Sequence, residues 1–250
     1  MAGHSKWANI KHRKGAQDAK RGKVFTKIIK EISVAVKQGG DDPSSNPRLR
    51  AAIQNAKAVN MPKDNVQRAI KKAAGDDDTS YMEVTYEGYA PHGVAIFIEC
   101  TTDNINRTVA DVRAIFNKTG GELGKNGSLE FLFAKKGVFL ITRDKIKIDL
   151  EEFEIELIDF GLEEFEVEQN MCTIICDFAK FGVIQDKLAE MNIDTHSAGI
   201  HRIPHESKTL SLDEALKILN IIERFEENDD VQEVFHNLNI TEEIITELNG

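Results

Sequence analysis

Residues 137–203 decide the fold class: GVFLITRDKIKIDLEEFEIELIDFGLEEFEVEQNMCTIICDFAKFGVIQDKLAEMNIDTHSAGIHRI. Short apolar runs in this stretch alternate with segments whose apolar residues recur every three to four positions. The first pattern is typical of strands and the second of helices. The predicted order is strand, helix, strand, strand, helix and strand, at 137–142, about 149–160, 163–168, 171–177, about 179–191 and about 195–203. Because this βαββαβ order is that of a ferredoxin-like domain, we expect an α+β protein.

A second α+β domain is predicted from the segments on both sides of this stretch. These are strands at 83–90 and 94–101, a helix at 104–118, a strand at 128–133, a helix near 212–226 and a strand at 231–238. The expected arrangement is two ferredoxin-like domains, with the third domain of the chain, at 135–207, inserted into a discontinuous second domain at 80–134 and 208–239. The acidic tail at 240–250 is predicted to be a short helix or disordered.

The N-terminal part, residues 1–76, is predicted to be a basic arm followed by a three-helix domain. Apolar residues at helical spacing predict a first helix from about 19 to 38, which two glycines end. The second helix begins at Asn46-Pro47, a combination that suits an N-cap and the first helical position. Met61-Pro62 separates it from the third helix, and an acidic linker follows.

The charge of the chain is divided between its two parts. Residues 1–75 hold 17 Lys and Arg against 5 acids, a net charge of +12. The whole chain has 32 bases and 42 acids, so the rest has 15 and 37, a net charge of −22. A positive end on a negative body predicts a polyanionic partner that contacts that end. The alternative is that the basic end packs against the acidic body of the same molecule.

The candidate nucleic-acid-binding residues are the cations and aromatic residues of the positive end. The lysines of the first helix gather opposite its apolar face, where Glu31 is the single nearby acid, so their repulsion is barely offset. Trp7 suits stacking on a base, or it anchors the arm onto the helical domain. Arg48, Arg50 and Lys57 are expected to be exposed. The full set is Lys6, Trp7, Lys11, His12, Arg13, Lys14, Lys20, Arg21, Lys23, Lys27, Lys30, Arg48, Arg50 and Lys57.

No motif indicates catalysis, a metal or a cofactor. Residues 120–128 resemble a phosphate-binding loop, but Thr119 stands where such a loop needs glycine, so we interpret them as a helix cap and a loop. His201 and His205 lack a second ligand pair at the spacing of a zinc site. We therefore predict a protein that is not an enzyme and that has no small-molecule substrate.

The cysteine content and hydropathy predict a cytoplasmic protein. Three cysteines without a secretory signal argue against a disulfide framework. Cys172 and Cys176 are four positions apart in a predicted strand, so both should point inward. No run of about 18 apolar residues is present, so no membrane span is expected.

Several stretches of the sequence resemble the YebC/PmpR family, which includes the mitochondrial translational activators of cytochrome oxidase. They are MAGHSKWANIKHRKGAQDAKRGKVFTKI, NPRLRAAIQNAK with NMPKDNVQRAIKKAAG, YEGYAPHGVAIFIECTTDNINRTVADVR, GGELGKNGSLEF and DDVQEVFHN. The resemblance runs from Met1 to about Leu238, with departures at Gly15 and Glu122, where the family usually has Ala and Asn. It implies a helical N-terminal domain, two α+β domains and a non-enzymatic regulator of gene expression in the cytoplasm.

Three functions are compatible with these features. The first is a DNA-binding transcriptional regulator, the description most members carry, although the sequence has no clear recognition helix. The second is a ribosome-associated translation factor that relieves stalling, binding ribosomal RNA with Trp7 or His12 stacked on an unpaired base. The third is an adaptor whose α+β domains bind other proteins.

Overall fold

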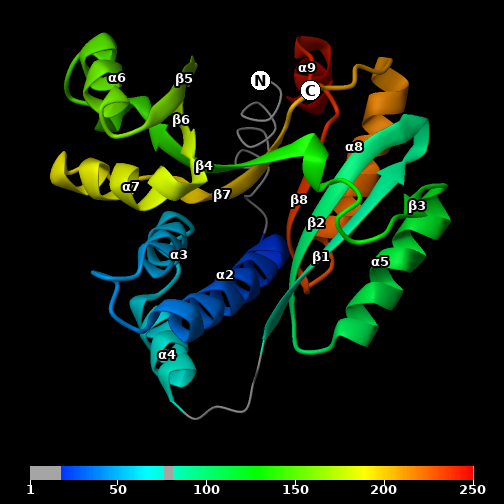
Figure 1. Cartoon of the computed structure of the whole chain (residues 1–250), viewed down its shortest axis with the longest axis horizontal. Helices are drawn as coiled ribbons and strands as arrows, with labels where there is room; N and C mark the ends of the chain where they lie inside the picture. The colour runs from blue at the N-terminus through cyan, green and yellow to red at the C-terminus, as the bar shows by residue number, and fades with distance from the viewer. Residues whose placement is uncertain (1–17, 76–80, 250) are drawn as a thin grey trace. The chain divides into compact units, whose positions relative to one another are not determined.

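The computed structural model describes residues 18–75 and 81–249, which form two compact units (Figure 1). The described part of the first unit is 18–27, 81–134 and 202–249, and that of the second is 28–75 and 135–201. The fold is α+β, with a helical N-terminal region followed by two four-stranded sheets. The domain boundaries expected from the sequence stay a prediction.

The three helices predicted near the N-terminus are confirmed. They are α2 (Asp18–Gly39), α3 (Pro47–Ala58) and α4 (Lys63–Ala74). Asn46 is the N-cap of α3, where its side chain accepts a hydrogen bond from the backbone N–H of Leu49. Its amide donates to the carbonyl oxygens of Ala35 and Gly40, each at 2.8 Å. One buried amide therefore joins the end of α2 to the start of α3.

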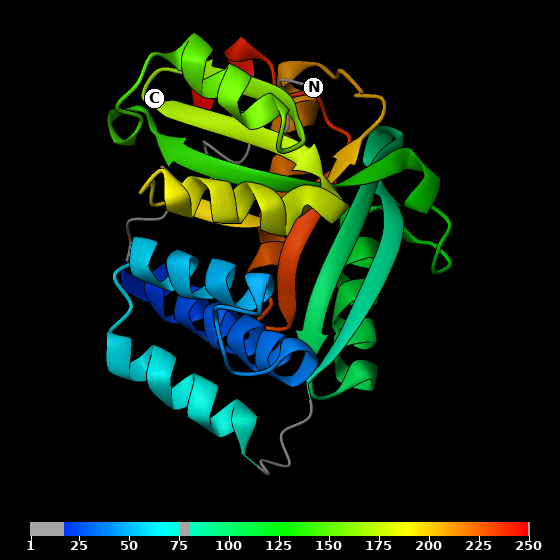
Figure 2. The same ribbon diagram turned by 60° about the vertical axis from the view of Figure 1, so that its left-hand side comes forward.

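The βαββαβ segment forms the sheet that lies mostly in the second unit (Figure 2). Its strands follow the order β5-β6-β4-β7, with β6 antiparallel to both neighbours. The core includes a stacked pair of rings, Phe139 and Phe181, 4.7 Å apart. The elements are β4 (Phe133–Thr142), α6 (Leu150–Ile158), β5 (Leu162–Glu168), β6 (Met171–Asp177), α7 (Phe181–Glu190) and β7 (Ser197–Pro204).

The sheet of the first unit collects strands from both sides of that segment, in the order β3-β1-β2-β8. Helices α5, α8 and α9 supply the apolar side chains that pack on one face of β2, whose residues include Ile96 and Ile98. On the other face, Phe97 packs with Leu129 and Phe133. The elements are β1 (Met82–Ala90), β2 (Val94–Thr102), α5 (Ile105–Thr119), β3 (Glu122–Leu123), α8 (Leu212–Glu226), β8 (Val231–His236) and α9 (Glu242–Asn249).

The strand predicted at 128–133 is wrong. The chain makes a 3₁₀ turn at Glu130–Leu132, and β4 begins at Phe133. In a strand, Leu129, Phe131 and Phe133 would share one face. In the structure Leu129 and Phe133 are buried against Phe97, and Phe131 is exposed. The turn is favoured because it brings both buried residues onto the sheet, a contact that local alternation does not reveal.

The three cysteine thiols are free and buried, which confirms the burial predicted for Cys172 and Cys176. Burial raises the pKa of Cys172, and burial with nearby Glu163 and Asp177 raises the pKa of Cys176 to about 12. Gly137 lies opposite Cys176, where a Cβ would stand 2.7 Å from the sulfur. The site is therefore tightly packed.

We expect Cys176 in the folded protein to react with iodoacetamide at pH 8 roughly a thousandfold more slowly than an unperturbed thiol, because the thiolate is the nucleophile. Mass spectrometry of the peptides after timed labelling would measure this rate. The matched control is the same protein in urea, where all three cysteines should react. Rapid labelling of Cys176 in buffer would show that β6 opens locally.

Candidate nucleic-acid interface

A positively charged face of the described chain lies on α4. Val66, Ala69, Ile70 and Ala73 are buried, which leaves the opposite side of the helix to solvent. The exposed cations of that side are Lys63, Arg68, Lys71 and Lys72. Asp64 is the one acid of the helix. Arg68, Lys71 and Lys72 are three and four positions apart, so they lie together on one helical face that phosphates can contact, and Lys63 is exposed at the start of the helix.

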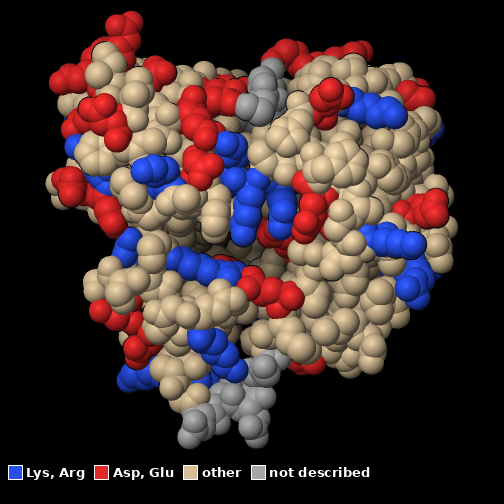
Figure 3. All heavy atoms as spheres, viewed as in Figure 1, with Lys and Arg blue, Asp and Glu red and all other residues tan. Residues whose placement is uncertain are grey.

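The two ends of α4 support this distribution of charge. Asp64 lies in the first turn and Lys71 and Lys72 in the last, which suits the dipole of the helix. Arg68 donates to the carbonyl oxygen of Asp64 and to the side chain of Asn65, so its guanidinium is held against the helix. Lysine and arginine side chains are visible at the lower left of Figure 3, where Figure 1 places α4.

Two of the predicted lysines of α2 hold the end of another helix within the first unit. The Nζ of Lys23 donates to the carbonyl oxygen of Glu227 at 2.8 Å, and that of Lys27 to the carbonyl oxygen of Glu226 at 2.9 Å. Carbonyl groups at a helix C-terminus lack partners within the helix and carry partial negative charge. Lys23 and Lys27 therefore satisfy the last carbonyls of α8. Lys30 is buried, with 7% of its surface exposed.

The cations predicted on α3 make ion pairs, and the exposure expected for two of them is wrong. Arg48 and Arg50 are half-buried, whereas Lys57 is exposed. Arg48 binds Glu31 at 2.7 Å. The other two pair with acids of the same unit that are far away in sequence. These pairs are Arg50 with Asp186 at 2.6 Å and Lys57 with Asp194 at 2.7 Å.

These ion pairs match the alternative in which basic side chains pack against acids of the same molecule. The contact is reinforced by the side-chain amide of Asn55, which bonds both the N–H and the carbonyl oxygen of Ala198. In the second unit, then, α3 is joined to α7 and β7 by polar side chains. The cations of α3 thus pair with acids of the second unit, and the four cations of α4 are all exposed to solvent.

Eight predicted residues have side chains outside the described part of the structure. Six of them belong to the arm: Lys6, Trp7, Lys11, His12, Arg13 and Lys14. Lys20 and Arg21 belong to the N-terminal part of α2. Their roles in nucleic-acid binding stay predictions.

A buried carboxylate that the sequence analysis did not single out organises the glycine-rich loop. Glu87 is 1% exposed, and its carboxylate accepts hydrogen bonds from the backbone N–H groups of Gly127 and Leu129. Its carbonyl oxygen accepts one from Gly124. The N–H groups of Gly124, Gly127 and Leu129 are therefore already bound within the protein. Gly120 is a left-handed C-cap of α5, which agrees with the interpretation of this stretch as a helix cap and a loop.

A second buried carboxylate, Asp230, joins α5 to the start of β8. It is 3% exposed and accepts hydrogen bonds from the hydroxyls of Thr102 and Thr108 at 3.1 and 2.9 Å. Arg107 donates to the same oxygen at 2.7 Å and also binds Asp103. The bonds to Asp230 and Asp103 raise the pKa of Arg107. The sequence signal for this network is the group of Thr, Asp and Arg residues at 101–108. Their shared partner, Asp230, lies more than 120 positions away along the chain.

The described residues include neither a membrane-spanning helix nor a cluster of metal-binding side chains. No helix at 18–75 or 81–249 is long and apolar enough to cross a membrane. Over the same residues, no three His, Cys, Asp or Glu side chains converge in a way that could hold a metal ion.

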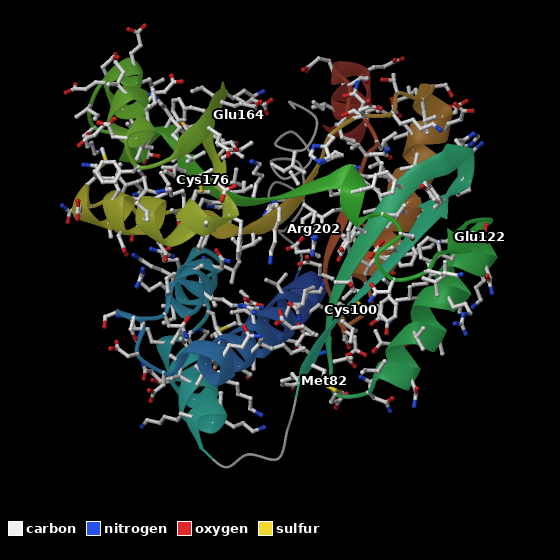
Figure 4. The ribbon with its side chains drawn as sticks, in the orientation of Figure 1. Met82, Cys100, Glu122, Glu164, Cys176 and Arg202 are labelled. Carbon is white, nitrogen blue, oxygen red and sulfur yellow. The ribbon has the colours of Figure 1, made fainter. Side chains whose placement is uncertain are left out.

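In the acidic part of the second unit, the surroundings of Glu164 on β5 destabilise its ionised form (Figure 4). Burial raises its pKa, and the charges of Glu166 and Glu163 raise it further, while Lys136 acts in the opposite direction. A carboxyl group whose pKa is higher in the folded protein contributes stability that is fully present at pH values below its ordinary pKa of 4.5. That stability is lost as the pH rises through the raised pKa.

We therefore expect Glu164→Gln to unfold at a higher temperature than the wild type at pH 7. The gain should be below about 1 kcal/mol, because the site is partly solvated. The difference should disappear below pH 4.5, where both side chains are neutral. Thermal unfolding of both proteins across this pH range tests the sign. An unchanged or lower melting temperature at pH 7 would contradict it.

Comparison with known proteins gives matches over almost the whole chain. The family model described as "TACO1/YebC protein N-terminal domain" matches residues 5–76, and "TACO1/YebC second and third domain" matches residues 81–238. A relative from Amoebophilus asiaticus is 52% identical over 240 residues, which are 95% of this chain and 98% of the relative. One from Geobacillus kaustophilus is 49% identical over 239 residues, covering 95% and 97%. Both are named "Probable transcriptional regulatory protein".

A solved structure has the same fold. It is the crystal structure of a conserved hypothetical protein from Aquifex aeolicus, with a TM-score of 0.81 and 39% sequence identity. The match covers 91% of this chain and 94% of that one.

Proposed function

Because the chain belongs to the TACO1/YebC family, we propose that it is a non-enzymatic regulator of gene expression that binds nucleic acid through its N-terminal region. The names of its relatives, probable transcriptional regulatory proteins, support the regulatory role. The observation that carries nucleic-acid binding is the solvent-facing side of α4, with four cations and one acid.

The binding we propose is directed at the phosphate backbone. Lys63, Lys71 and Lys72 have long side chains that carry positive charge, and phosphates attract such groups without regard to base sequence. The acidic remainder of the chain, with a net charge of −22, repels the same polyanion. Contact is thus restricted to one part of the molecule. We propose duplex DNA as the first target, in line with the names of the relatives.

Ribosomal RNA is the second candidate target, and the division of charge favours it. A factor with one basic region and an acidic remainder can bind RNA with the first and stay clear of the neighbouring RNA with the second. It would then regulate translation, and any effect on transcription would be indirect.

In-cell UV crosslinking followed by sequencing of the recovered nucleic acid distinguishes the two candidate targets, DNA and ribosomal RNA. DNA from a few promoters would support the transcriptional regulator, and a discrete segment of ribosomal RNA would support the translation factor. The matched comparison is a Lys63→Gln/Lys71→Gln protein beside a Lys118→Gln/Lys125→Gln protein, since both lose two exposed lysines. Equal recovery from the two variants would remove α4 from the interface, and recovery at background from the wild type would refute nucleic-acid binding.

A further inference from the structure

Helix α6 presents apolar side chains to solvent in the second unit. Phe153 and Leu157 are fully buried and anchor the helix, and the Phe153 ring packs on Phe165 of β5. Ile155 and Ile158 point the other way and are 67% and 55% exposed. Because they are three positions apart, they lie side by side on the outer face of the helix. Two large aliphatic side chains on one outer face suggest a contact with a partner.

The surroundings of these isoleucines are strongly acidic. Residues 149–168 contain ten acids and no Lys or Arg. Among the described residues, two neighbouring cations are already paired: Lys187 of α7 with Glu156, and Lys136 of β4 with Glu163. The side chain of Lys180 also lies beside Gly161, so the acids still outnumber the cations around the helix. Acids of the outer face that are exposed and form no ion pair with a described residue are Glu151, Glu152, Glu154 and Asp159. Figure 3 shows acidic side chains crowded at the upper left, where Figure 1 places α6 and β5.

This combination limits what can cover the face. The negative charge repels nucleic acid, anionic lipid and a second copy of the same face. The basic face of α4 on a second copy would match the charge, but its exposed side chains are polar except for Ala74. It offers no large apolar group to Ile155 and Ile158.

We propose that the outer face of α6 docks a cationic polypeptide segment of a partner protein that carries aliphatic side chains between its lysines or arginines. The aliphatic side chains cover Ile155 and Ile158 at the centre of the contact, and the cations pair with the ring of carboxylates around them. An apolar centre with a charged rim is the usual anatomy of a specific protein–protein interface. This surface is separate from α4, at the opposite end of the second unit (Figures 1 and 2), and the inference stands whether or not α4 binds nucleic acid.

The test uses two labelled peptides with the full-length protein. The probe is a 14-residue lysine–leucine peptide whose leucines recur at three- and four-residue spacing, and the comparison peptide has serine in place of leucine. We expect the lysine–leucine peptide to bind with a Kd in the micromolar range and the lysine–serine peptide at least tenfold more weakly. Fluorescence anisotropy measures both. Equal binding of the two peptides would overturn the proposal, because charge alone would then explain the binding.

Variants locate the binding. Ile155→Gln/Ile158→Gln should weaken binding of the lysine–leucine peptide at least tenfold. Both positions are exposed, so the variant should fold, and circular dichroism verifies this. Glu151→Gln/Glu154→Gln should also weaken binding of this peptide and should reduce the salt dependence of the binding. The matched control is Glu243→Gln/Glu247→Gln on α9, which loses the same charge from exposed positions and should bind like the wild type.

Other outcomes refute the docking of a cationic segment. Binding that survives both α6 variants would place the peptide elsewhere. A fall in the mass of the protein in solution on changing Ile155 and Ile158 would show that a second copy covers the face. Retention of the wild type, but not of the isoleucine variant, on anionic phosphatidylglycerol vesicles would show a membrane contact.

Discussion

Replacing Asp230 with alanine is expected to lower the free energy of unfolding by about 3 kcal/mol. Removing one partner of a buried ion pair costs about 3–5 kcal/mol, and we take the lower end because Arg107 is half-exposed and keeps water. The substitution also leaves the hydroxyl of Thr102 without its acceptor and removes one of the acceptors of Thr108. Urea unfolding monitored by circular dichroism measures the change as a shift of the midpoint at constant slope.

Asp103→Ala is the matched control for this prediction. It removes the other carboxylate bound to Arg107, at 2.8 Å, but from an exposed position just before α5. Exposed ion pairs contribute about 0–1 kcal/mol, so the control should be close to the wild type. If both variants lose the same stability, the effect comes from the charge of Arg107 and not from the buried network. A loss below about 1 kcal/mol for Asp230→Ala would contradict the role assigned to that network.

Changing Lys63, Lys71 and Lys72 together to glutamine is expected to weaken binding to duplex DNA about a hundredfold at 0.15 M salt. Each phosphate contact contributes a slope of about −0.9 to the dependence of log affinity on log salt, so three contacts change the slope by about 2.7. At 0.15 M salt that difference corresponds to about two orders of magnitude in affinity. Titration of a labelled 20-base-pair duplex at several salt concentrations measures the slope and the affinity in one experiment.

The control for the triple variant removes exposed lysines from other elements: Lys118, Lys125 and Lys145. It has the same net charge as the triple variant, so any general effect of charge is equal in the two proteins. The proposed interface requires the slope to change for the α4 variant and to stay nearly constant for the control. Equal changes in the two would indicate a diffuse attraction by the whole protein.

Local signals predicted most of the elements. The helix expected near 212–226 is α8 at Leu212–Glu226, because apolar side chains recur at helical spacing and Ser211 with Glu214 forms a capping box at its start. The strands around 91–93 follow from alternation and a turn in the same way. These signals act between residues a few positions apart, so one sequence suffices to find them. The tail, predicted to be a short helix or disordered, forms α9, with Ile244 buried in the core of the first unit.

The candidate site was less predictable than the fold. The sequence identified the positive end of the chain, but it did not show which cations have partners in the same molecule. Arg50 binds Asp186, 136 positions away, and Lys23 binds the carbonyl of Glu227, 204 positions away. Such pairs depend on how the elements pack. The same holds for Phe131 and the turn at Glu130–Leu132, which replaced an expected strand.

By itself the sequence determined the type and order of most elements, the N-cap of α3, the burial of Cys172 and Cys176 and the division of charge. These follow from helix and strand periodicity, from side-chain capping and from composition, all of which act locally or as a sum over residues. The tertiary structure alone decided which charged side chains are buried or paired within the molecule. It placed Glu87 and Asp230 in the core and paired the cations of α3, and it left those of α4 facing solvent. The reason is that the energy of a charge depends on its burial and its partner, and both are set by segments far apart in the chain.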